Sequence, residues 1–168
     1  PSANVGTFLN NNELRIGMAL RLGSEICKPH SCNCEEHVKT TGRHGLSCVF
    51  SQGRFARHAE LNDINARTFR STNTPAKLEP TGLYRDDGKR PDGMTLIPWT
   101  KGKSLVWDAT CVDTFAKSYL QQTSVKAGSA ADQAVRKKHS LYQKIKSQNY
   151  NFVALAVETM GPWSTEAK

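Results

Sequence analysis

The stretch RPDGMTLIPWTKGKSLVWDATCV, residues 90–112, contains two apolar runs separated by a short polar segment. The runs span residues 94–99 and 104–112, and the segment between them includes Gly102, which can adopt the positive φ angle of a tight turn. This pattern predicts an antiparallel β-hairpin. Pro98 has no amide hydrogen to donate, so we expect the first strand to be bent or to lie at a sheet edge.

Two aspartates lie at the open end of this hairpin. Folding the chain about residues 101–102 places Asp92 opposite residues near Thr110, so Asp92 and Asp108 should lie close together. Opposed carboxylates repel each other unless a cation lies between them, and Mg²⁺ prefers oxygen ligands and activates water against phosphodiesters. The alternative is that Asp92 only forms a turn after Pro91 and that Asp108 caps a following helix.

Outside the hairpin, apolar periodicity and capping residues predict the remaining elements. The expected helices span residues 11–21, 54–70, 113–121 and 129–148, and the expected further strands span residues 77–83 and 152–158. Asn11 or Asn12 would cap the first helix, Gly23 would end it, and Asp113 would cap the third. This order of elements predicts an α/β fold.

The composition is typical of a folded protein with an anionic partner. The length of 168 residues suits one globular domain with a small appended module. A net charge of +8 and a pI of about 9.4 favour nucleic acid as the partner. No run of about 20 apolar residues is present, and residues 1–10 lack the features of a signal peptide. We therefore expect a soluble, intracellular protein with no membrane partner.

The cysteines indicate a metal site. Their number, five, is odd, and four of them lie between positions 27 and 48 among histidines. The spacing Cys-x-Cys-x9-His-x3-Cys predicts structural Zn²⁺ bound by four protein ligands with no open position. The predicted ligands are Cys32, Cys34, His44 and Cys48. Because the first two cysteines are unusually close in sequence, Cys27 or His30 stays open as a replacement for one of them.

The motifs Arg90-Pro91-Asp92-Gly93 and Trp107-Asp108-Ala109-Thr110, with the cysteine motif before them, resemble the PD-(D/E)xK nuclease superfamily. Residues 32–161 are similar to the restriction-like endonuclease domain of non-LTR retrotransposon polyproteins, which nick target DNA to prime reverse transcription. The resemblance implies a small mixed central sheet flanked by helices and preceded by a zinc knuckle. It divides the chain into an N-terminal helical segment (1–26), a zinc knuckle (27–52) and an endonuclease domain (53–168). It also implies a nuclear location, and as partners DNA and the reverse transcriptase and RNA of the same polyprotein.

The resemblance assigns roles to individual residues. Asp92 matches the first metal-binding aspartate, and Asp108 matches the second acidic position, both for Mg²⁺ or Mn²⁺. Thr110 stands where the superfamily has its catalytic lysine, and the retrotransposon branch takes this lysine from a following helix, where Lys138 is the best match. Glu79 resembles a further acidic residue at the end of the first strand. The reserve candidates are Lys117 and Lys137 for the lysine, and Glu60 or Asp63 for an acidic residue on the first helix.

Positive charge is concentrated around the predicted site. Between positions 117 and 146 there are seven Lys or Arg residues and one acidic residue, and a second basic group brackets the two aspartates. We expect these side chains to bind the phosphates of DNA. The residues assigned to nucleic-acid binding are Lys89, Arg90, Lys117, Arg136 and Lys137.

Two other interpretations are compatible with the sequence. Because Thr110 replaces a lysine, the chain could be a non-catalytic, zinc-containing module that binds DNA or RNA. A structure-selective junction resolvase would differ from a nickase only in its substrate. Nicking needs one active site, whereas a double-strand break usually implies two copies, so the sequence does not define the oligomeric state.

Overall fold

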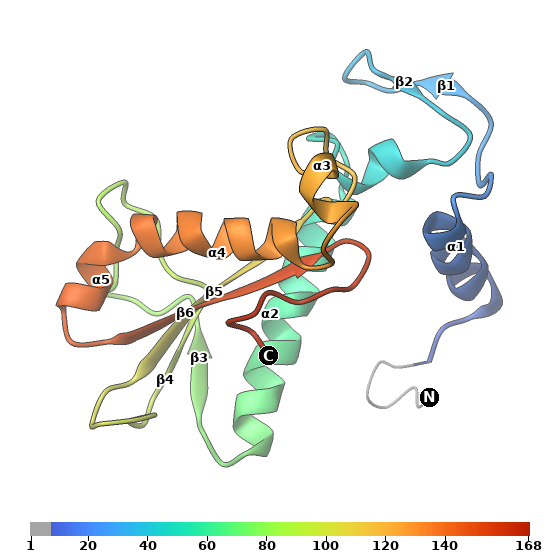
Figure 1. The fold of residues 1–168 in the computed structure, drawn as a ribbon. Coiled ribbons are helices and arrows are strands. Elements are labelled where there is room, and N and C mark those ends of the chain that lie inside the picture. The colour runs from blue at the N-terminus through green and yellow to red at the C-terminus, as the bar shows by residue number, and fades with distance from the viewer. Residues whose placement is uncertain (1–7) are drawn as a thin grey trace. The chain divides into compact units, whose positions relative to one another are not determined.

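The computed structural model describes residues 8–168 (Figure 1). Contacts between residues divide the chain into two compact units, one that ends at Arg54 and one from Phe55 to Lys168. The second unit contains a four-stranded mixed sheet with helices, which confirms the predicted α/β class. Residues 1–7 of the predicted N-terminal segment lie outside the described residues. No helix within residues 8–168 is both long enough and apolar enough to cross a membrane.

The sheet has the strand order β3-β4-β5-β6. The bounds are Ala76–Leu78 for β3, Gly93–Thr95 for β4, Leu105–Val112 for β5 and Asn151–Glu158 for β6. The first three strands are antiparallel neighbours, whereas β6 runs parallel to β5 along its whole length. A parallel neighbour requires a crossover connection, and the helices between β5 and β6 supply it. The predicted hairpin and final strand are therefore both present.

The register of the hairpin differs from the predicted one. Gly93 pairs with Trp107 and Met94 with Val106, and the Asp92 amide donates to the Trp107 carbonyl (3.1 Å), so Asp92 lies next to this pair instead of opposite residues near Thr110. Residues 96–99, which include a proline, leave the ladder and lengthen the first arm of the hairpin. These additional residues bring Asp92 nearer to Asp108 along β5 than the predicted register does.

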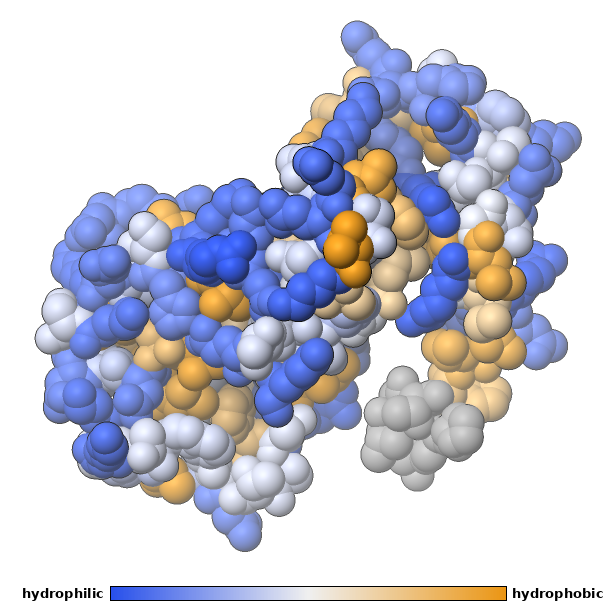
Figure 2. Space-filling model, viewed as in Figure 1, coloured by the Kyte–Doolittle hydropathy of each residue, from blue (hydrophilic) through white to orange (hydrophobic). Residues whose placement is uncertain are grey.

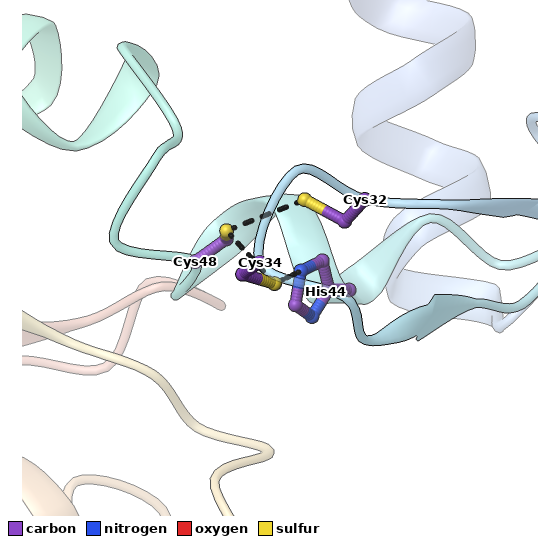
Figure 3. A group of neighbouring side chains, drawn as sticks. All are labelled: Cys32, Cys34, His44 and Cys48. Carbon is purple, nitrogen blue, oxygen red and sulfur yellow. Dashed lines mark hydrogen bonds between the residues drawn. The ribbon is translucent and has the colours of Figure 1, made fainter.

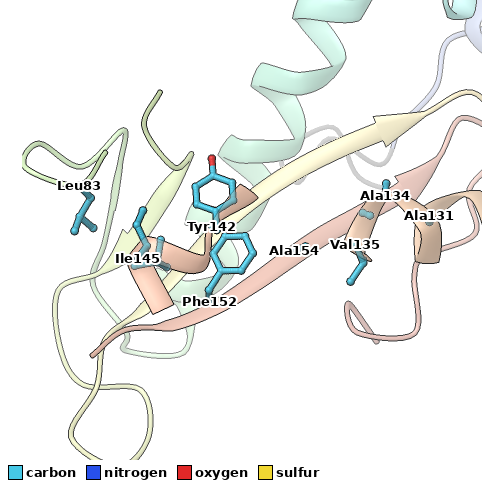
Figure 4. Packing of buried hydrophobic residues seen from close by; sticks show 10 residues of the cluster. Leu83, Ala131, Ala134, Val135, Tyr142, Ile145, Phe152 and Ala154 are labelled. Carbon is cyan, nitrogen blue, oxygen red and sulfur yellow. The ribbon is translucent and has the colours of Figure 1, made fainter. Parts of the chain in front are cut away.

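One face of the sheet is covered by α4 (Ser129–Leu141), with α5 (Gln143–Ser147) after it (Figures 1 and 4). The single helix predicted over residues 129–148 is wrong, because the chain leaves helical geometry at Tyr142 (φ −104°, ψ 19°). The Tyr142 ring is buried and stacks on Phe152 with 4.4 Å between ring centroids. The core on this face consists of Leu83, Val106, Ala131, Ala134, Val135, Tyr142, Ile145, Phe152, Ala154 and Ala156.

The other face of the sheet is covered by α2 (Gly53–Ser71). Neighbouring residues of a strand point to opposite faces, so Trp107 belongs to this side, where it packs with Ala66 and Phe69. Trp107 is fully buried and lies flat over the backbone of Gly93. A Cβ atom at Gly93 would lie 2.0 Å from Trp107 Cζ2, so only glycine fits in this part of β4.

Two predicted elements are shorter than expected. The strand predicted over residues 77–83 ends early, because Glu79 adopts a left-handed φ of 44° and a proline follows it. The helix predicted over residues 113–121 does not form as predicted; the Asp113 carboxylate accepts a hydrogen bond from the Phe115 amide, and residues 114–115 form a turn. A short helix, α3 (Leu120–Thr123), forms after this turn.

The free edge of β6 is covered by the chain that follows it. Residues 162–164 turn back along the strand, where Trp163 forms an isolated bridge to Val157. The Ser164 amide donates to the Ala156 carbonyl (2.9 Å), and the Glu158 amide donates to the carbonyl of residue 162 (2.9 Å). The Ala154 amide donates to the Glu166 carboxylate (3.0 Å). Several backbone groups on this edge, mainly toward the end of β6, are therefore already hydrogen-bonded within the chain.

The first unit has little apolar core of its own. It contains α1 (Asn11–Leu22), the two-residue strands β1 (His30–Ser31) and β2 (His37–Val38), and a 3₁₀ helix, η2 (Arg43–Leu46). Helix α1 is capped by Asn10, one residue before the predicted caps, and none of its residues is buried. Among the described residues of this unit, Val38 and Cys48 are the only buried hydrophobic side chains. An interaction other than apolar packing must therefore stabilise the first unit.

Candidate metal centre and candidate active site

The four predicted zinc ligands of the first unit come together in one cluster (Figure 3). Their ligand atoms all lie within 4.8 Å of one another. The Cys48 Sγ atom is 3.6 Å from that of Cys32 and 3.7 Å from that of Cys34, and Cys34 Sγ is 3.2 Å from His44 Nε2. A tetrahedron with Zn–S bonds of about 2.3 Å has edges of about 3.8 Å. The cluster can therefore hold a metal ion and has dimensions compatible with structural zinc.

Local backbone geometry positions the two halves of this cluster. Cys32 and Cys34 lie on the tight turn between β1 and β2, where Glu35 adopts a left-handed φ of 68° and its amide donates to the Cys32 carbonyl. His44 lies in η2, and the Cys48 amide donates to its carbonyl (3.0 Å). The short spacings of the motif are therefore spanned by one turn on each side.

The two alternative ligands lie outside the cluster. The Cys27 thiol donates to the carbonyls of Lys39 (3.4 Å) and Thr40 (3.6 Å). His30 Nδ1 lies 2.9 Å from the Lys28 carbonyl. The structure therefore assembles the predicted ligand set without these two residues.

The sulfur atoms of the cluster do not titrate alike. The backbone amide of Cys34 and the His44 side chain lower the pKa of Cys32 to about 6, so its thiolate forms readily. The Glu36 amide lowers the pKa of Cys34, but burial and the neighbouring sulfurs outweigh it, and the pKa is raised. A bound cation would allow several thiolates to lie side by side, as metal binding to cysteine requires.

In the second unit, Asp92 lies just before β4 and is held on two sides. Its amide donates to the carbonyl of Trp107 (3.1 Å), the residue that pairs with Gly93. Its Oδ2 atom accepts a hydrogen bond from the Ala109 amide (2.7 Å) and lies 3.2 Å from His58 Nε2 on α2. The hydrogen bond to the carboxylate raises the pKa of His58 although partial burial opposes this.

Asp108 is buried on the α4 side of the sheet, with 4% of its surface exposed. One carboxylate oxygen accepts a hydrogen bond from the Tyr142 hydroxyl, and the other forms an ion pair with Lys138. Burial raises the pKa of Asp108, the Lys138 charge opposes this shift, and the charge of Asp92 adds to it. Burial and the same carboxylate also raise the pKa of Tyr142, which therefore stays a hydrogen-bond donor.

The structure thus brings Asp92, Asp108 and Lys138 together and leaves other predicted acidic residues outside. The Glu79 amide donates to the Asp92 carbonyl (2.8 Å), but its exposed carboxylate pairs with Arg90 (2.9 Å). The reserve acids of α2, Glu60 and Asp63, both pair with Arg67 on the exposed side of that helix.

Two residues of this site were not predicted. His58 is not among the residues that the sequence singles out, yet it contacts Asp92 from α2. Tyr142 was not assigned a role, although it lies four residues after Lys138, a spacing that places both side chains on one face of a helix. No comparable signal in the sequence connects His58 with the hairpin.

The basic residues assigned to DNA lie mainly on exposed surface. Lys89, Lys117 and Arg136 are exposed, and Arg90 is held by Glu79. Lys137 is also exposed and donates to the Tyr119 hydroxyl (3.3 Å). Figure 2 shows hydrophilic side chains over the outer side of α4, where two of these residues lie.

The chain matches no protein-family model, and no curated protein sequence matches it.

Proposed function

We propose that the chain is a Mg²⁺- or Mn²⁺-dependent endonuclease that nicks DNA, with the restriction-endonuclease-like fold and the role of a target-cleaving domain of a retrotransposon protein. The observation that carries the proposal is that Asp92 bonds to the backbone of Trp107 and Ala109, the two neighbours of Asp108 in β5, while Lys138 reaches Asp108 from α4. The mixed sheet with a helix on each face and the four-residue metal cluster also support it.

The carboxylate pair has the chemistry of a site for a hard cation. Asp92 and Asp108 are both largely shielded from solvent, with side-chain exposures of 16% and 6%. Such a pair is electrostatically costly by itself. Burial is the main cause of the raised pKa of Asp108, and repulsion by Asp92 adds to it; a divalent cation bound by both carboxylates would relieve that repulsion. When bound, Mg²⁺ polarises the phosphodiester and lowers the pKa of an attacking water.

The side chains around the carboxylates have separate tasks in this proposal. Asp92 and Asp108 would hold the cation. The Lys138 ammonium would stabilise the negative charge that develops on the phosphate, because a fixed cation in a partly buried site acts more strongly than in water. Tyr142 would keep the Asp108 carboxylate in one orientation. The exposed basic residues of α4 would bind the DNA backbone on either side.

The zinc cluster would have a structural task. Four protein ligands leave no position for water or substrate, so zinc there would fold the first unit instead of taking part in catalysis. In the full polyprotein, the reverse transcriptase and its RNA would be further partners, and the location would be nuclear.

A second candidate function is a zinc-containing module that binds nucleic acid without cutting it. Both carboxylate oxygens of Asp108 are already engaged by Lys138 and Tyr142, and Thr110 stands in the usual position of the catalytic lysine. With both oxygens of Asp108 engaged, the site would not bind the cation, whereas the basic surface would still bind nucleic acid. A junction resolvase would have the same site and select branched DNA.

The experiment that tests the proposal is nicking of supercoiled plasmid with Mg²⁺ or Mn²⁺. We expect the parent chain to nick, and Asp92→Ala and Asp108→Ala to lose at least about 100-fold in rate, because no cation would be held. Lys138→Ala should lose a similar factor while the cation still binds. Asp63→Ala is the matched control, since it removes an exposed acidic side chain of α2.

A gel-shift assay on the same proteins separates the candidate functions. If every variant binds DNA and only the parent and the control cut it, the endonuclease is supported. If the parent binds DNA and cuts with neither metal, the binding module replaces it. A strong preference for four-way junctions over plasmid would favour the resolvase.

A further inference from the structure

The two carboxylate oxygens of Asp92 have different surroundings. The Oδ2 atom receives the Ala109 amide (2.7 Å) and faces His58 Nε2 (3.2 Å). Within the described part of the chain, no donor is hydrogen-bonded to Oδ1. One oxygen is thus anchored from two directions, and the other is available for a ligand.

His58 is itself held in place. Asn62, one helical turn further along α2, directs its side-chain Nδ2 toward His58 Nδ1 at 3.5 Å, and Asn62 is buried. An amide donor at Nδ1 fits the tautomer that carries its proton on Nε2, the atom that faces Asp92. Contacts therefore run from Asn62 to His58 on α2, and from His58 to Asp92 beside the sheet.

We propose that His58 is a positioning residue for the cation site, one that fixes the rotation of the Asp92 carboxylate so that Oδ1 faces the cation. The inference rests on the proposed function, because it assigns a task within that cation site. By itself, the hydrogen bond from the Ala109 amide to Oδ2 is a single contact. It still allows a broad range of rotation about the terminal side-chain torsion angle of Asp92. A second donor from a different element removes this freedom before the cation binds.

The arrangement also explains why the two aspartates are supported from opposite sides. Asp108 is oriented by Tyr142 from the α4 side, and Asp92 is oriented by His58 from α2. Helices on the two faces of the sheet therefore each hold one carboxylate. A change in either helix would move one of the two ligands relative to the other.

The test is Mn²⁺ binding measured by isothermal titration calorimetry on the zinc-loaded chain, which does not depend on cleavage. We expect His58→Ala to weaken Mn²⁺ binding by about 10- to 100-fold, the usual loss when a group that orients a metal ligand is removed. His58→Gln, whose amide can still donate to Asp92, should stay within about threefold of the parent. His37→Ala is the matched control, because it removes an exposed histidine from β2.

The outcomes separate this inference from the proposed function. A selective loss in His58→Ala, with His58→Gln near the parent and an unchanged melting temperature, supports the positioning role. If the parent binds Mn²⁺ and His58→Ala binds it equally well, the inference is overturned and the cation site stands. If the parent does not bind Mn²⁺, both are overturned. Equal losses in His58→Ala and His58→Gln would also overturn the inference, since donor chemistry would not matter.

Discussion

Removal of the metal should unfold the first unit and leave the second unit folded. The buried hydrophobic side chains of the described first unit are Val38 and Cys48, and burial of a valine contributes only about 1.5–3 kcal/mol. Ordering each backbone residue costs about 1–2 kcal/mol, so these contacts cannot order residues 27–48. In zinc-finger peptides the apparent free energy of Zn²⁺ binding, about 10–16 kcal/mol at neutral pH, already includes the cost of folding. Zinc bound by the cluster would therefore decide whether this unit folds.

The assay is heteronuclear NMR during stepwise addition of a zinc chelator, with metal content measured by mass spectrometry. We expect one zinc per chain, and its removal should collapse the dispersed amide signals of residues 27–51 while β5 and β6 keep theirs. Cys48→Ser should reproduce the chelated spectrum. Cys27→Ser is the matched control and should retain one zinc, because its thiol lies outside the cluster.

The reasoning would be refuted if the chelated protein kept dispersed signals for the residues around Cys32 and His44. It would also be refuted if the purified chain bound no zinc while its three cysteine ligands were in the reduced thiol form. Loss of zinc from Cys27→Ser, with retention in Cys48→Ser, would show that the ligand set is a different one.

Three further predictions concern the second unit. Gly93→Ala should reduce the free energy of unfolding by about 1–3 kcal/mol in urea denaturation, because its Cβ would lie 2.0 Å from Trp107; an unchanged midpoint would contradict the packing. The Thr165 amide lowers the pKa of Asp132 below its ordinary 3.8, so Asp132 stabilises the fold fully above pH 3.8 and loses this effect as pH falls through its lower folded pKa. Asp132→Asn should therefore lower the free energy of unfolding by about 1 kcal/mol at pH 7. The difference between this variant and the parent should become smaller only as the pH falls below 3.8. Lys137→Ala should reduce the salt dependence of DNA binding in fluorescence anisotropy by about 0.9 in log–log slope, and an unchanged slope would exclude a phosphate contact.

The elements that the sequence predicted well are those in which local pattern and final structure agree. The continuous apolar runs of β5 and β6 are typical of strands buried on both faces, and they form with nearly the expected bounds. The spacing of the cysteine motif predicted the four residues of the cluster, because they lie close together in the chain, and left open only whether Cys27 or His30 replaces one of them.

The remaining features depend on contacts between distant parts of the chain. The register of the hairpin depends on how residues 96–99 leave the ladder, which periodicity does not encode. The break at Tyr142 forms because its ring packs on Phe152 and its hydroxyl reaches Asp108, both distant in sequence. His58 meets Asp92 only because α2 packs on the sheet, so no local pattern identifies the pair.

The hydrogen bonds along β6 restrict how two copies of this chain could associate. Exposed strand edges are where sheets of different molecules join, but residues 162–164 already occupy this edge beside residues 156–158. The opposite edge, β3, is three residues long, and Arg70 from α2 binds the Ala76 carbonyl (3.2 Å). A sheet that continued across two chains along the whole of β6 would therefore first require residues 162–164 to detach.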